Sequence, residues 1–415
     1  MPMRILVEAY GCTLNRGEAD EFIDGLVEAG HEPVVSQEDA EAFVIFTCGV
    51  IDTTERRMLR KIGEFSKEPE KPLLVCGCLS NICPDKIRKI APHAMLFGPS
   101  EQINALKSLG AEWRPNKTAR NGAVGILPIA TGCKGSCTYC VTRNARGALK
   151  SRTPKDLRQR LGALVNSGAA EIQLCAQDSA VYGADLGIGL GELIGTLESV
   201  NGDFMMRIGM MNPSGVKTNS DNILAAYGSH KVFKFLHLPV QSGSDSVLER
   251  MGRRYTVEDF SNIVREFRSR FPGLTLSTDI IVGFPGETDD EFLESMKLMR
   301  AAKPDIINIT RFSSRPGTGA HTMKPKIISR KIKDRSKIMT DLRFELTGEN
   351  YRDMAGMAVR ALATERKVPG TTLLRTPEYK PVVVDGEAEL GKWHSVEITG
   401  NARAYLSGIL NDTSD

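Results

Sequence analysis

The stretch "ATGCKGSCTYCVTRNARG", residues 130–147, contains three cysteines in the pattern C-x3-C-x2-C. They are Cys133, Cys137 and Cys140, and three thiols so close together are typical of a metal-ligand set. The apolar run "GILPIAT" comes directly before them and predicts a β-strand. The cysteines therefore follow the carboxyl end of a strand, which is where the active sites of β/α barrels lie.

Three kinds of site are consistent with these cysteines. A zinc site would need a fourth Cys or His, but the flanking histidines are His93 and His230 and the next cysteine is Cys175. A redox pair would normally be C-x2-C without a third thiol. A four-iron cluster held by only three cysteines would leave one iron open to a small ligand. The spacing and the strand before it favour the open cluster over the other two.

The residues after this stretch alternate between strand and helix patterns. Six strand candidates follow one another over about 200 residues, and helical segments such as 154–166, 256–271 and 289–302 separate most of them. The strand candidates read "GILPIATGC", "EIQLCAQDS", "FMMRIGMM", "VFKFLHLPVQ", "LTLSTDIIVGF" and "DIINITRFSS". Because a complete (β/α)8 barrel usually needs a longer chain, this pattern predicts an open (β/α)6 partial TIM barrel.

The residues before the barrel predict a separate α/β domain. Three apolar runs, "RILVEAYGC", "AFVIFTCG" and "PLLVCGC", are separated by helical stretches at 18–29 and 54–65. Strands that alternate with helices in this way form parallel sheets. We therefore expect a Rossmann-like domain at residues 1–112, followed by a polar, breaker-rich linker at 110–122.

The residues after the barrel strands predict a long helix and then a second kind of fold. Apolar residues recur three and four positions apart from Lys324 onward, so a helix should bury one face. The residues of this face are Ile328, Ile332, Arg335, Met339, Leu342 and Leu346. We assign the barrel and this helix to residues 113–350. Several short strands follow within residues 351–415 and predict a small β-barrel.

Three further cysteines occupy equivalent places in the N-terminal domain. Cys12, Cys48 and Cys78 each end a predicted strand. The carboxyl ends of parallel strands meet at one edge of a sheet, so these thiols can come together in space. Free cysteines are also common as small buried hydrophobic residues, but three at the same relative position favour a ligand set. We interpret Cys76, Cys83 and Cys175 as structural.

Composition and charge limit the class of protein. The chain has 415 residues, a net charge of +3 and nine cysteines. No apolar stretch is long enough to span a membrane, so we expect a cytoplasmic protein without a membrane partner. Residues 311–345 contain ten Lys or Arg and three Asp or Glu. Such a local excess is typical of a surface that binds RNA phosphates, although a solvated helix face is an alternative.

The motifs together resemble those of the radical S-adenosylmethionine (SAM) methylthiotransferases along nearly the whole chain. The resemblance rests on "GCTLNRGEAD" at Cys12, "CGV" at Cys48, "GCLSN" at Cys78, "GCKGSCTYC", "LHLPVQSGSD", "TDIIVGFPGET" and "RFSSRPGTGA". It implies that the C-terminal barrel is similar to the RNA-binding TRAM domain. It also implies two 4Fe-4S clusters, an auxiliary one on Cys12, Cys48 and Cys78 and a catalytic one on Cys133, Cys137 and Cys140.

In that family two SAM molecules are used per turnover: one methylates a sulfur on the auxiliary cluster, and the other is cleaved to a radical. The resemblance places SAM and substrate beside the ends of the barrel strands. We therefore predict cofactor contacts from Gln177, Asp178, Gln241, Asp279, Val282, Gly283 and Phe284. Glycine next to a strand end also allows a ligand to approach the backbone closely.

The stretch "CTYCVTRNARGALKSRTP" is similar to the archaeal and eukaryotic branch of the family. This similarity implies a sulfurtransferase that adds a methylthio group to C2 of N6-threonylcarbamoyladenosine in the tRNA anticodon stem-loop. The expected partners are that tRNA, a flavodoxin or ferredoxin-like electron donor, and an unknown sulfur donor. Alternative substrates are isopentenyladenosine tRNA and a ribosomal protein aspartate. A non-catalytic iron–sulfur protein that binds RNA is an alternative of a different class.

Overall fold

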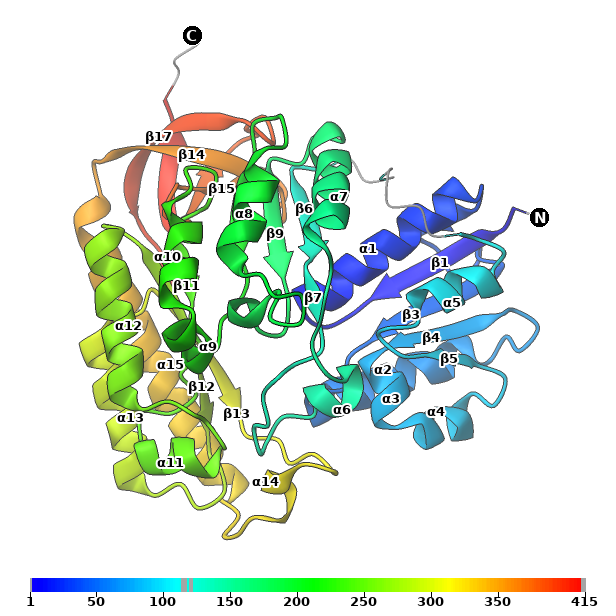
Figure 1. Ribbon diagram of the computed structural model, residues 1–415, viewed down its shortest axis with the longest axis horizontal. Helices are drawn as coiled ribbons and strands as arrows, with labels where there is room; N and C mark the ends of the chain where they lie inside the picture. Colours follow the sequence, from blue (N-terminus) through cyan, green and yellow to red (C-terminus); the bar gives the residue numbers. More distant parts are fainter. Residues whose placement is uncertain (1, 113–117, 119–121, 412–415) are drawn as a thin grey trace.

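A computed structural model describes residues 2–112, 118 and 122–411 of the chain (Figure 1). The N-terminal domain is a five-stranded parallel sheet with the order β2-β1-β3-β4-β5. Its strands are β1 (Arg4–Ala9), β2 (Glu32–Val34), β3 (Ala42–Thr47), β4 (Leu73–Gly77) and β5 (Met95–Phe97). The predicted parallel sheet is confirmed. The two edge strands were not predicted, because three residues are too few for a periodic pattern.

Helices cover both faces of this sheet. They are α1 (Thr13–Glu28), α2 (Asp52–Phe65), α3 (Cys78–Ile82), α4 (Pro84–Ile90) and α5 (Gln102–Ser108). Helices α1 and α5 pack on the face that carries Val44, Phe46 and Cys76. Helices α2 and α4 pack on the face that carries Ile45 and Val75. Both faces are buried, which explains why the central strands read as continuous apolar runs.

The central domain has the six parallel strands that the sequence predicts. They are β6 (Val124–Pro128), β9 (Glu171–Cys175), β10 (Met205–Ile208), β11 (Phe235–His237), β12 (Thr275–Val282) and β13 (Ile306–Arg311). They pair as β10-β9-β6 and β11-β12-β13, and a parallel bridge between Met206 and Val232 joins the two halves. The strands form an open partial barrel, as expected.

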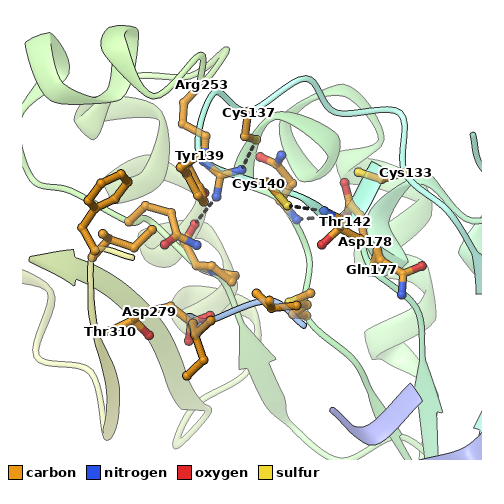
Figure 2. Close-up of a pocket in the computed structure, with 18 of the residues that line it drawn as sticks. Cys133, Cys137, Tyr139, Cys140, Thr142, Gln177, Asp178, Arg253, Asp279 and Thr310 are labelled. Atoms are coloured by element: carbon orange, nitrogen blue, oxygen red, sulfur yellow. Dashed lines mark hydrogen bonds between the residues drawn. The ribbon is translucent and has the colours of Figure 1, made fainter. Parts of the chain in front are cut away.

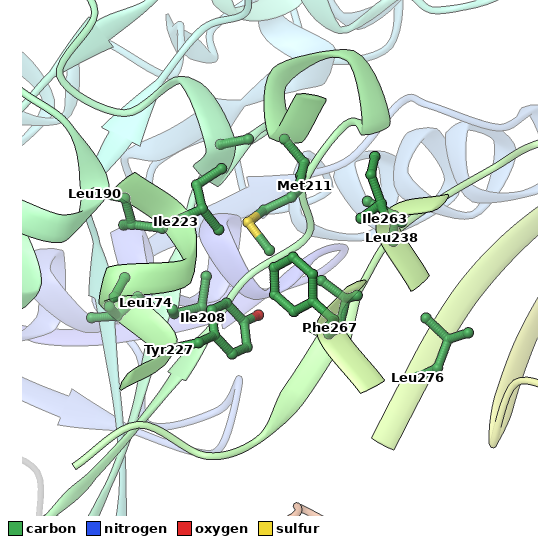
Figure 3. Packing of buried hydrophobic residues seen from close by; sticks show 14 of the residues in the cluster. Leu174, Leu190, Ile208, Met211, Ile223, Tyr227, Leu238, Ile263, Phe267 and Leu276 are labelled. Atoms are coloured by element: carbon green, nitrogen blue, oxygen red, sulfur yellow. The ribbon is translucent and has the colours of Figure 1, made fainter. Parts of the chain in front are cut away.

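Helices cover the outside of this partial barrel. The main ones are α7 (Pro154–Asn166), α8 (Leu190–Glu198), α9 (Pro213–Thr218), α10 (Ser220–Gly228), α11 (Asp245–Arg250), α12 (Val257–Arg270) and α13 (Asp289–Ala302). The pocket drawn in Figure 2 lies where the strands end. Beneath it, side chains from strands and helices form one continuous apolar core, which includes Met211, Tyr227 and Phe267 (Figure 3).

A short hairpin, which was not predicted, supports the cysteine-rich stretch. Strand β7 (Ala130–Thr131) pairs antiparallel with β8 (Lys150–Ser151), and α6 (Thr142–Arg146) lies between them. The cysteine loop therefore leaves the barrel through β7 and returns through β8. The hairpin fixes both ends of the loop.

The long helix α15 (Ser329–Tyr351) connects the partial barrel to the C-terminal domain. It begins at Ser329 rather than at Lys324. Pro325 disfavours helical backbone only at Lys324, and Ile328, the N-cap residue, has an extended backbone. Ile328 is 69% exposed and is not part of the apolar face, whereas Met339, Leu342 and Leu346 are buried as expected.

The C-terminal domain is a closed five-stranded barrel with the order β14-β15-β16-β18-β17, as the sequence predicts. Its strands are β14 (Ala358–Glu365), β15 (Thr371–Arg375), β16 (Pro381–Asp385), β17 (Trp393–Asn401) and β18 (Leu406–Leu410). It packs against the amino ends of the central strands, where the Tyr379 hydroxyl donates to Glu171 at 2.5 Å. The small barrel therefore lies at the opposite end of the strands from the cysteines (Figure 1).

The expected boundaries at residues 112 and 350 stay predictions, and most of the predicted linker at 110–122 lies outside the described residues. None of the described helices has the length and apolar composition that crossing a membrane requires.

Candidate active site between two cysteine sets

Cys133, Cys137 and Cys140 line a cavity of about 290 Å³ at the carboxyl ends of the barrel strands (Figure 2). The cavity is also lined by residues that follow or end β9, β10, β11, β12 and β13. Val50 and Ile51 of the N-terminal domain complete its wall. The cavity therefore lies between the two domains, with the thiols of the cysteine loop on one side.

The backbone around the first cysteine can form only with glycine at position 132. Gly132 has a φ of +77°, and a Cβ there would lie 1.9 Å from the carbonyl oxygen of Ala148. A side chain would therefore push the two arms of the hairpin apart. Directly after it, the Cys133 N–H donates to the carbonyl of Gly147 at 3.2 Å.

Each of the three sulfurs accepts a hydrogen bond. The Gly135 N–H donates to Cys133 Sγ at 3.2 Å, and the Thr142 N–H donates to Cys140 Sγ at 3.4 Å. The Arg253 guanidinium donates to Cys137 Sγ at 3.4 Å. Donors aimed at sulfur stabilise thiolates and tune iron–sulfur clusters. The surroundings of the loop therefore fit a cluster.

Four of the seven predicted cofactor residues line the cavity: Gln177, Asp178, Gln241 and Asp279. The Gln177 side-chain oxygen is buried and has no partner among the described residues, so it can accept a hydrogen bond from a ligand. Gln241 has a φ of +73°, which is costly for a residue other than glycine and is commonest at functional sites.

The two carboxylates in the cavity differ in how tightly they bind a proton. Burial raises the pKa of Asp178 to about 6, although it accepts hydrogen bonds from the N–H groups of Ala180 and Asn212. Burial also opposes ionisation of Asp279, but hydrogen bonds from His237 and Asn308 outweigh it and lower the pKa of Asp279. Asp279 therefore loses its proton at a lower pH than Asp178 does.

Val282, Gly283 and Phe284 do not line this cavity. Val282 and Phe284 are fully buried, and the Gly283 N–H donates to Glu287 at 2.8 Å. A Cβ on Gly283 would lie 2.5 Å from Ile332 of α15, so this glycine allows the helix to approach the end of β12. Their predicted contact with a cofactor stays a prediction.

Sequence reasoning missed Arg253 and Tyr139. Arg253 lies in the turn after α11 and reaches the cavity, where its guanidinium carbon is 6.0 Å from the Tyr139 ring centre. Nothing in the run "MGRRYT" separates this arginine from its exposed neighbour Arg254. Tyr139 lies inside the cysteine motif, but its direction depends on the fold of the loop.

The N-terminal domain brings the second set of cysteines to one edge of its sheet, as the topology requires. Cys12 is the N-cap residue of α1, Cys48 follows β3, and Cys78 is the first residue of α3. Burial raises the pKa of Cys78 to about 11; Arg146 opposes this shift, and the nearby thiolates of Cys12 and Cys48 add to it. The three thiols therefore interact electrostatically with one another.

Neither cysteine set has the geometry of a site for one metal ion. Within the described ranges, no three Cys, His, Asp or Glu side chains lie close enough together to bind a single ion. A zinc ion would need all its ligands within about 2.3 Å of one centre. The cysteine ligands of a four-iron cluster each bind a different iron, so the assignment of both sets to clusters stays a prediction.

The other cysteines have different surroundings. Cys76 and Cys175 are buried, at 1% and 5% exposure, and Cys76 packs with the apolar residues under α1 and α5. Burial strongly opposes ionisation of these two thiols and raises the pKa of each. Cys83 is half-buried near Glu55. Their structural role remains a prediction that these surroundings support.

Comparisons with known proteins give matches to both the N-terminal domain and the central domain. Residues 127–299 match the radical SAM superfamily, and residues 4–98 match the uncharacterised protein family UPF0004. The chain is 37% identical to a protein of Pyrococcus horikoshii named probable threonylcarbamoyladenosine tRNA methylthiotransferase, over 98% of this chain and 99% of the relative.

The chain belongs to the radical SAM methylthiotransferase family. A Drosophila melanogaster member, named threonylcarbamoyladenosine tRNA methylthiotransferase, is 32% identical over 87% of this chain and 69% of its own length. A Sulfurihydrogenibium member, named tRNA-2-methylthio-N(6)-dimethylallyladenosine synthase, is 28% identical over 98% of this chain and 99% of its own.

Radical SAM methylthiotransferases are enzymes that use SAM and 4Fe-4S clusters. Among solved structures, the radical SAM methyltransferase TsrM from Kitasatospora setae has a TM-score of 0.59 at 15% identity, over 77% of this chain and 75% of that chain. A second TsrM structure, with cobalamin and a [4Fe-4S] cluster bound, has a TM-score of 0.58 at 14% identity, over 90% and 81% of the two chains. These likenesses show a shared fold.

Proposed function

We propose that this methylthiotransferase adds a methylthio group to C2 of N6-threonylcarbamoyladenosine in the anticodon stem-loop of tRNA. The main support is the 37% identity, over 98% of the chain, to a relative that carries this name. Cys133, Cys137 and Cys140 line the cavity, and Val50 and Ile51, which follow Cys48, form part of its wall. The two cysteine sets fit this activity, because it needs one site for radical formation and another for sulfur.

A second candidate substrate is dimethylallyladenosine in tRNA, also called isopentenyladenosine. It is favoured by the full-length similarity to the Sulfurihydrogenibium member, although the identity is only 28%. Both substrates would require the same two cysteine sets. The two cysteine sets therefore do not distinguish between these substrates.

In this proposal the six cysteines form two separate ligand sets. Cys133, Cys137 and Cys140 hold the cluster whose open iron binds SAM, and Cys12, Cys48 and Cys78 hold the auxiliary cluster. When bound, these cofactors supply a carbon-centred radical, a methyl group and sulfur. The chain itself would orient them and exclude water, and the half-buried thiols of Cys133, Cys137 and Cys140, which line a cavity of about 290 Å³, suit that task.

The polar residues of the cavity would position SAM and the target base. The unpartnered oxygen of Gln177 can accept from an amino group, and the charge of Asp279 favours a cationic ligand. Gln241 and Asp178 are the remaining predicted contacts in the cavity. Arg253 fixes Cys137 through its sulfur and stands beside Tyr139, so it would hold the loop around the cluster.

The tRNA would contact α15 and the C-terminal barrel as well as the cavity. Helix α15 has 23 residues, which is about 35 Å of helix, and it runs from the end of β12 to the C-terminal barrel. Of the basic residues at 311–345, Arg315 and Arg335 are buried in ion pairs and cannot contact phosphates. Arg330, Lys333 and Lys337 are exposed and are the better candidates.

A tRNA substrate would also agree with the expected cytoplasmic location. A low-potential electron donor of the flavodoxin or ferredoxin type would supply the electron for SAM cleavage, and the sulfur donor remains unassigned.

An anaerobic assay with dithionite, SAM and tRNA tests this proposal. Reconstituted protein should contain about eight irons, form 5′-deoxyadenosine and methylthiolate the tRNA. The Cys12→Ala/Cys48→Ala/Cys78→Ala variant should keep about four irons and SAM cleavage, but make no methylthio product. The Cys133→Ala/Cys137→Ala/Cys140→Ala variant should keep about four irons and lose both activities. Methylthiolation by either variant would contradict the proposal, and so would stoichiometric zinc.

A further inference from the structure

Arg146 connects the radical SAM loop to the auxiliary cysteine set. It is the last residue of α6, six positions after Cys140, and it is only 4% exposed. Its side chain leaves the central domain and enters the N-terminal domain, where its Nε–H donates to Cys78 Sγ at 3.3 Å. A buried arginine that contacts a proposed cluster ligand from the other domain requires an explanation.

All five N–H groups of the Arg146 guanidinium have acceptors. Besides Cys78, its two terminal nitrogens donate to both carboxylate oxygens of Glu18 at 2.6 and 2.9 Å. They also donate to Asn15 Oδ1 at 3.4 Å and to Thr131 Oγ1 at 3.3 Å. Because the five donors of arginine point in fixed directions, this set of contacts fixes the positions of the four partners relative to one another.

These partners connect Arg146 to elements that adjoin both cysteine sets. Asn15 and Glu18 lie on α1, the helix whose N-cap residue is Cys12. Thr131 ends β7, two residues before Cys133. One guanidinium therefore contacts the ligand Cys78, the helix that begins at Cys12, and the strand that leads into the other cysteine loop.

We propose that Arg146 is a positioning residue that sets the reduction potential and the retention of the auxiliary cluster on Cys12, Cys48 and Cys78. This inference rests on the proposed function, because it requires those cysteines to hold a cluster. An N–H that donates to a ligand sulfur stabilises the more negative, reduced state of a cluster and so raises its reduction potential. Glu18 compensates the buried charge and holds the guanidinium in place.

A neighbouring ion pair provides a matched control. Arg152, in the segment that follows β8, donates to both carboxylate oxygens of Glu21 on α1, at 2.5 and 2.6 Å. Glu21 lies one turn after Glu18 on the same helix, and both carboxylates are buried. The two arginines therefore make the same kind of bridge between the two domains. None of the hydrogen bonds of Arg152 within the described residues goes to sulfur, whereas Arg146 donates to Cys78.

The test uses full-length protein with Cys133→Ala, Cys137→Ala and Cys140→Ala, so that only the auxiliary cluster remains. Arg146→Lys and Arg152→Lys are compared in this background, since lysine keeps the charge but loses the planar fork. Two quantities are measured anaerobically: the midpoint potential of the cluster by electron paramagnetic resonance, and the rate of iron release to a chelator.

Arg146→Lys should lower the ratio of reduced to oxidised cluster at a fixed potential by about tenfold, which is about 59 mV for one electron. It should also release iron several-fold faster than the background. Arg152→Lys should change neither quantity, even if it destabilises the fold as much.

Equal potentials and equal release rates for the background and Arg146→Lys would overturn the inference. Equal changes in both lysine variants would also overturn it, because the effect would then come from loosening the interface. A background protein without iron would instead reject the assignment of Cys12, Cys48 and Cys78 as ligands, and with it the proposed division of the two clusters.

Discussion

Glu55 of α2 and Arg315 of the segment after β13 form a buried ion pair between the N-terminal and central domains. Their side chains are only 5% and 4% exposed. Glu55 also accepts from Lys86 at 2.6 Å, and two residues before Arg315 the Ser313 hydroxyl accepts from the Asp52 N–H. Together with the contacts of Arg146 and Arg152, this pair joins the N-terminal and central domains.

Replacing Glu55 with Gln should destabilise the protein by about 3 kcal/mol or more, because Arg315 would stay buried without a countercharge. Glu64→Gln on the same helix is the control, since Glu64 is half-exposed and its Lys61 contact is 3.7 Å. Urea denaturation measures both variants. If Glu55→Gln lowers the free energy of unfolding by less than about 1 kcal/mol, the ion pair contributes little to the stability of the domain interface.

Gly11 should be required for the auxiliary site. It has a φ of +99°, and a Cβ there would lie 2.6 Å from Cys48 Cβ and 3.1 Å from its sulfur. Gly11→Ala should therefore displace Cys48 and reduce the iron content from about eight to about four per chain. Gly30→Ala is the control, because Gly30 has a φ of +86° but nothing within 4 Å of a Cβ. An iron content of about eight in both variants would mean that the site does not require glycine at position 11.

Asp178 should make the stability of the cofactor-free protein depend on pH. Its folded pKa is about 6 against a usual value of 3.8, so the folded chain binds the proton more tightly than the unfolded chain. The contribution of Asp178 to stability therefore falls as the pH rises from about 4 to about 6, by about 3 kcal/mol in full.

Asp178→Asn removes this titration and keeps an oxygen that can accept from Ala180 and Asn212. Its stability advantage over the natural protein should be about 1–2 kcal/mol larger at pH 7.5 than at pH 5. Urea denaturation at the two pH values gives this difference. An advantage that does not change with pH would mean that Asp178 titrates normally.

The exposed basic residues of α15 should contact tRNA phosphates. Arg330, Lys333 and Lys337 are three and four residues apart and so share one face of the helix. Replacing all three with Glu should weaken tRNA binding and reduce the slope of log K against log salt by about 2 to 3. The control replaces the exposed Lys67, Lys107 and Lys297 with Glu, which changes the net charge by the same amount at other sites. An equal effect in both triple variants would indicate only a general charge effect.

The fold could be predicted largely because its buried strands have strong local patterns. Val44 and Ile45 lie in a six-residue strand that is buried along its whole length, and such runs are visible in the sequence. The hairpin β7-β8 could not be predicted, because each strand has two residues and its pairing depends on the turn around Gly132. The start of α15 could not be predicted from the apolar spacing, because that spacing includes Ile328, whose backbone is extended and whose side chain is exposed.

The placement of the cysteines could be predicted where it depends on spacing or topology. The cysteine motif has a fixed spacing, and Cys12, Cys48 and Cys78 share a position relative to the sheet. The contacts of Arg146 and Arg253 could not be predicted, because each depends on a side chain that crosses between segments more than 60 residues apart. Arg335 lies on the apolar face of α15 because Glu287 neutralises it there, which no periodic pattern reveals.

Mass spectrometry of tRNA nucleosides tests the central claim most directly. Cells that lack this protein are compared with cells that express it and with cells that express the Cys12→Ala/Cys48→Ala/Cys78→Ala variant. We predict that 2-methylthio-N6-threonylcarbamoyladenosine is present only with the natural protein and that N6-threonylcarbamoyladenosine accumulates in the other two. Unchanged amounts of this methylthio nucleoside in all three would contradict the account, and a change in the dimethylallyl nucleoside instead would select the second candidate substrate.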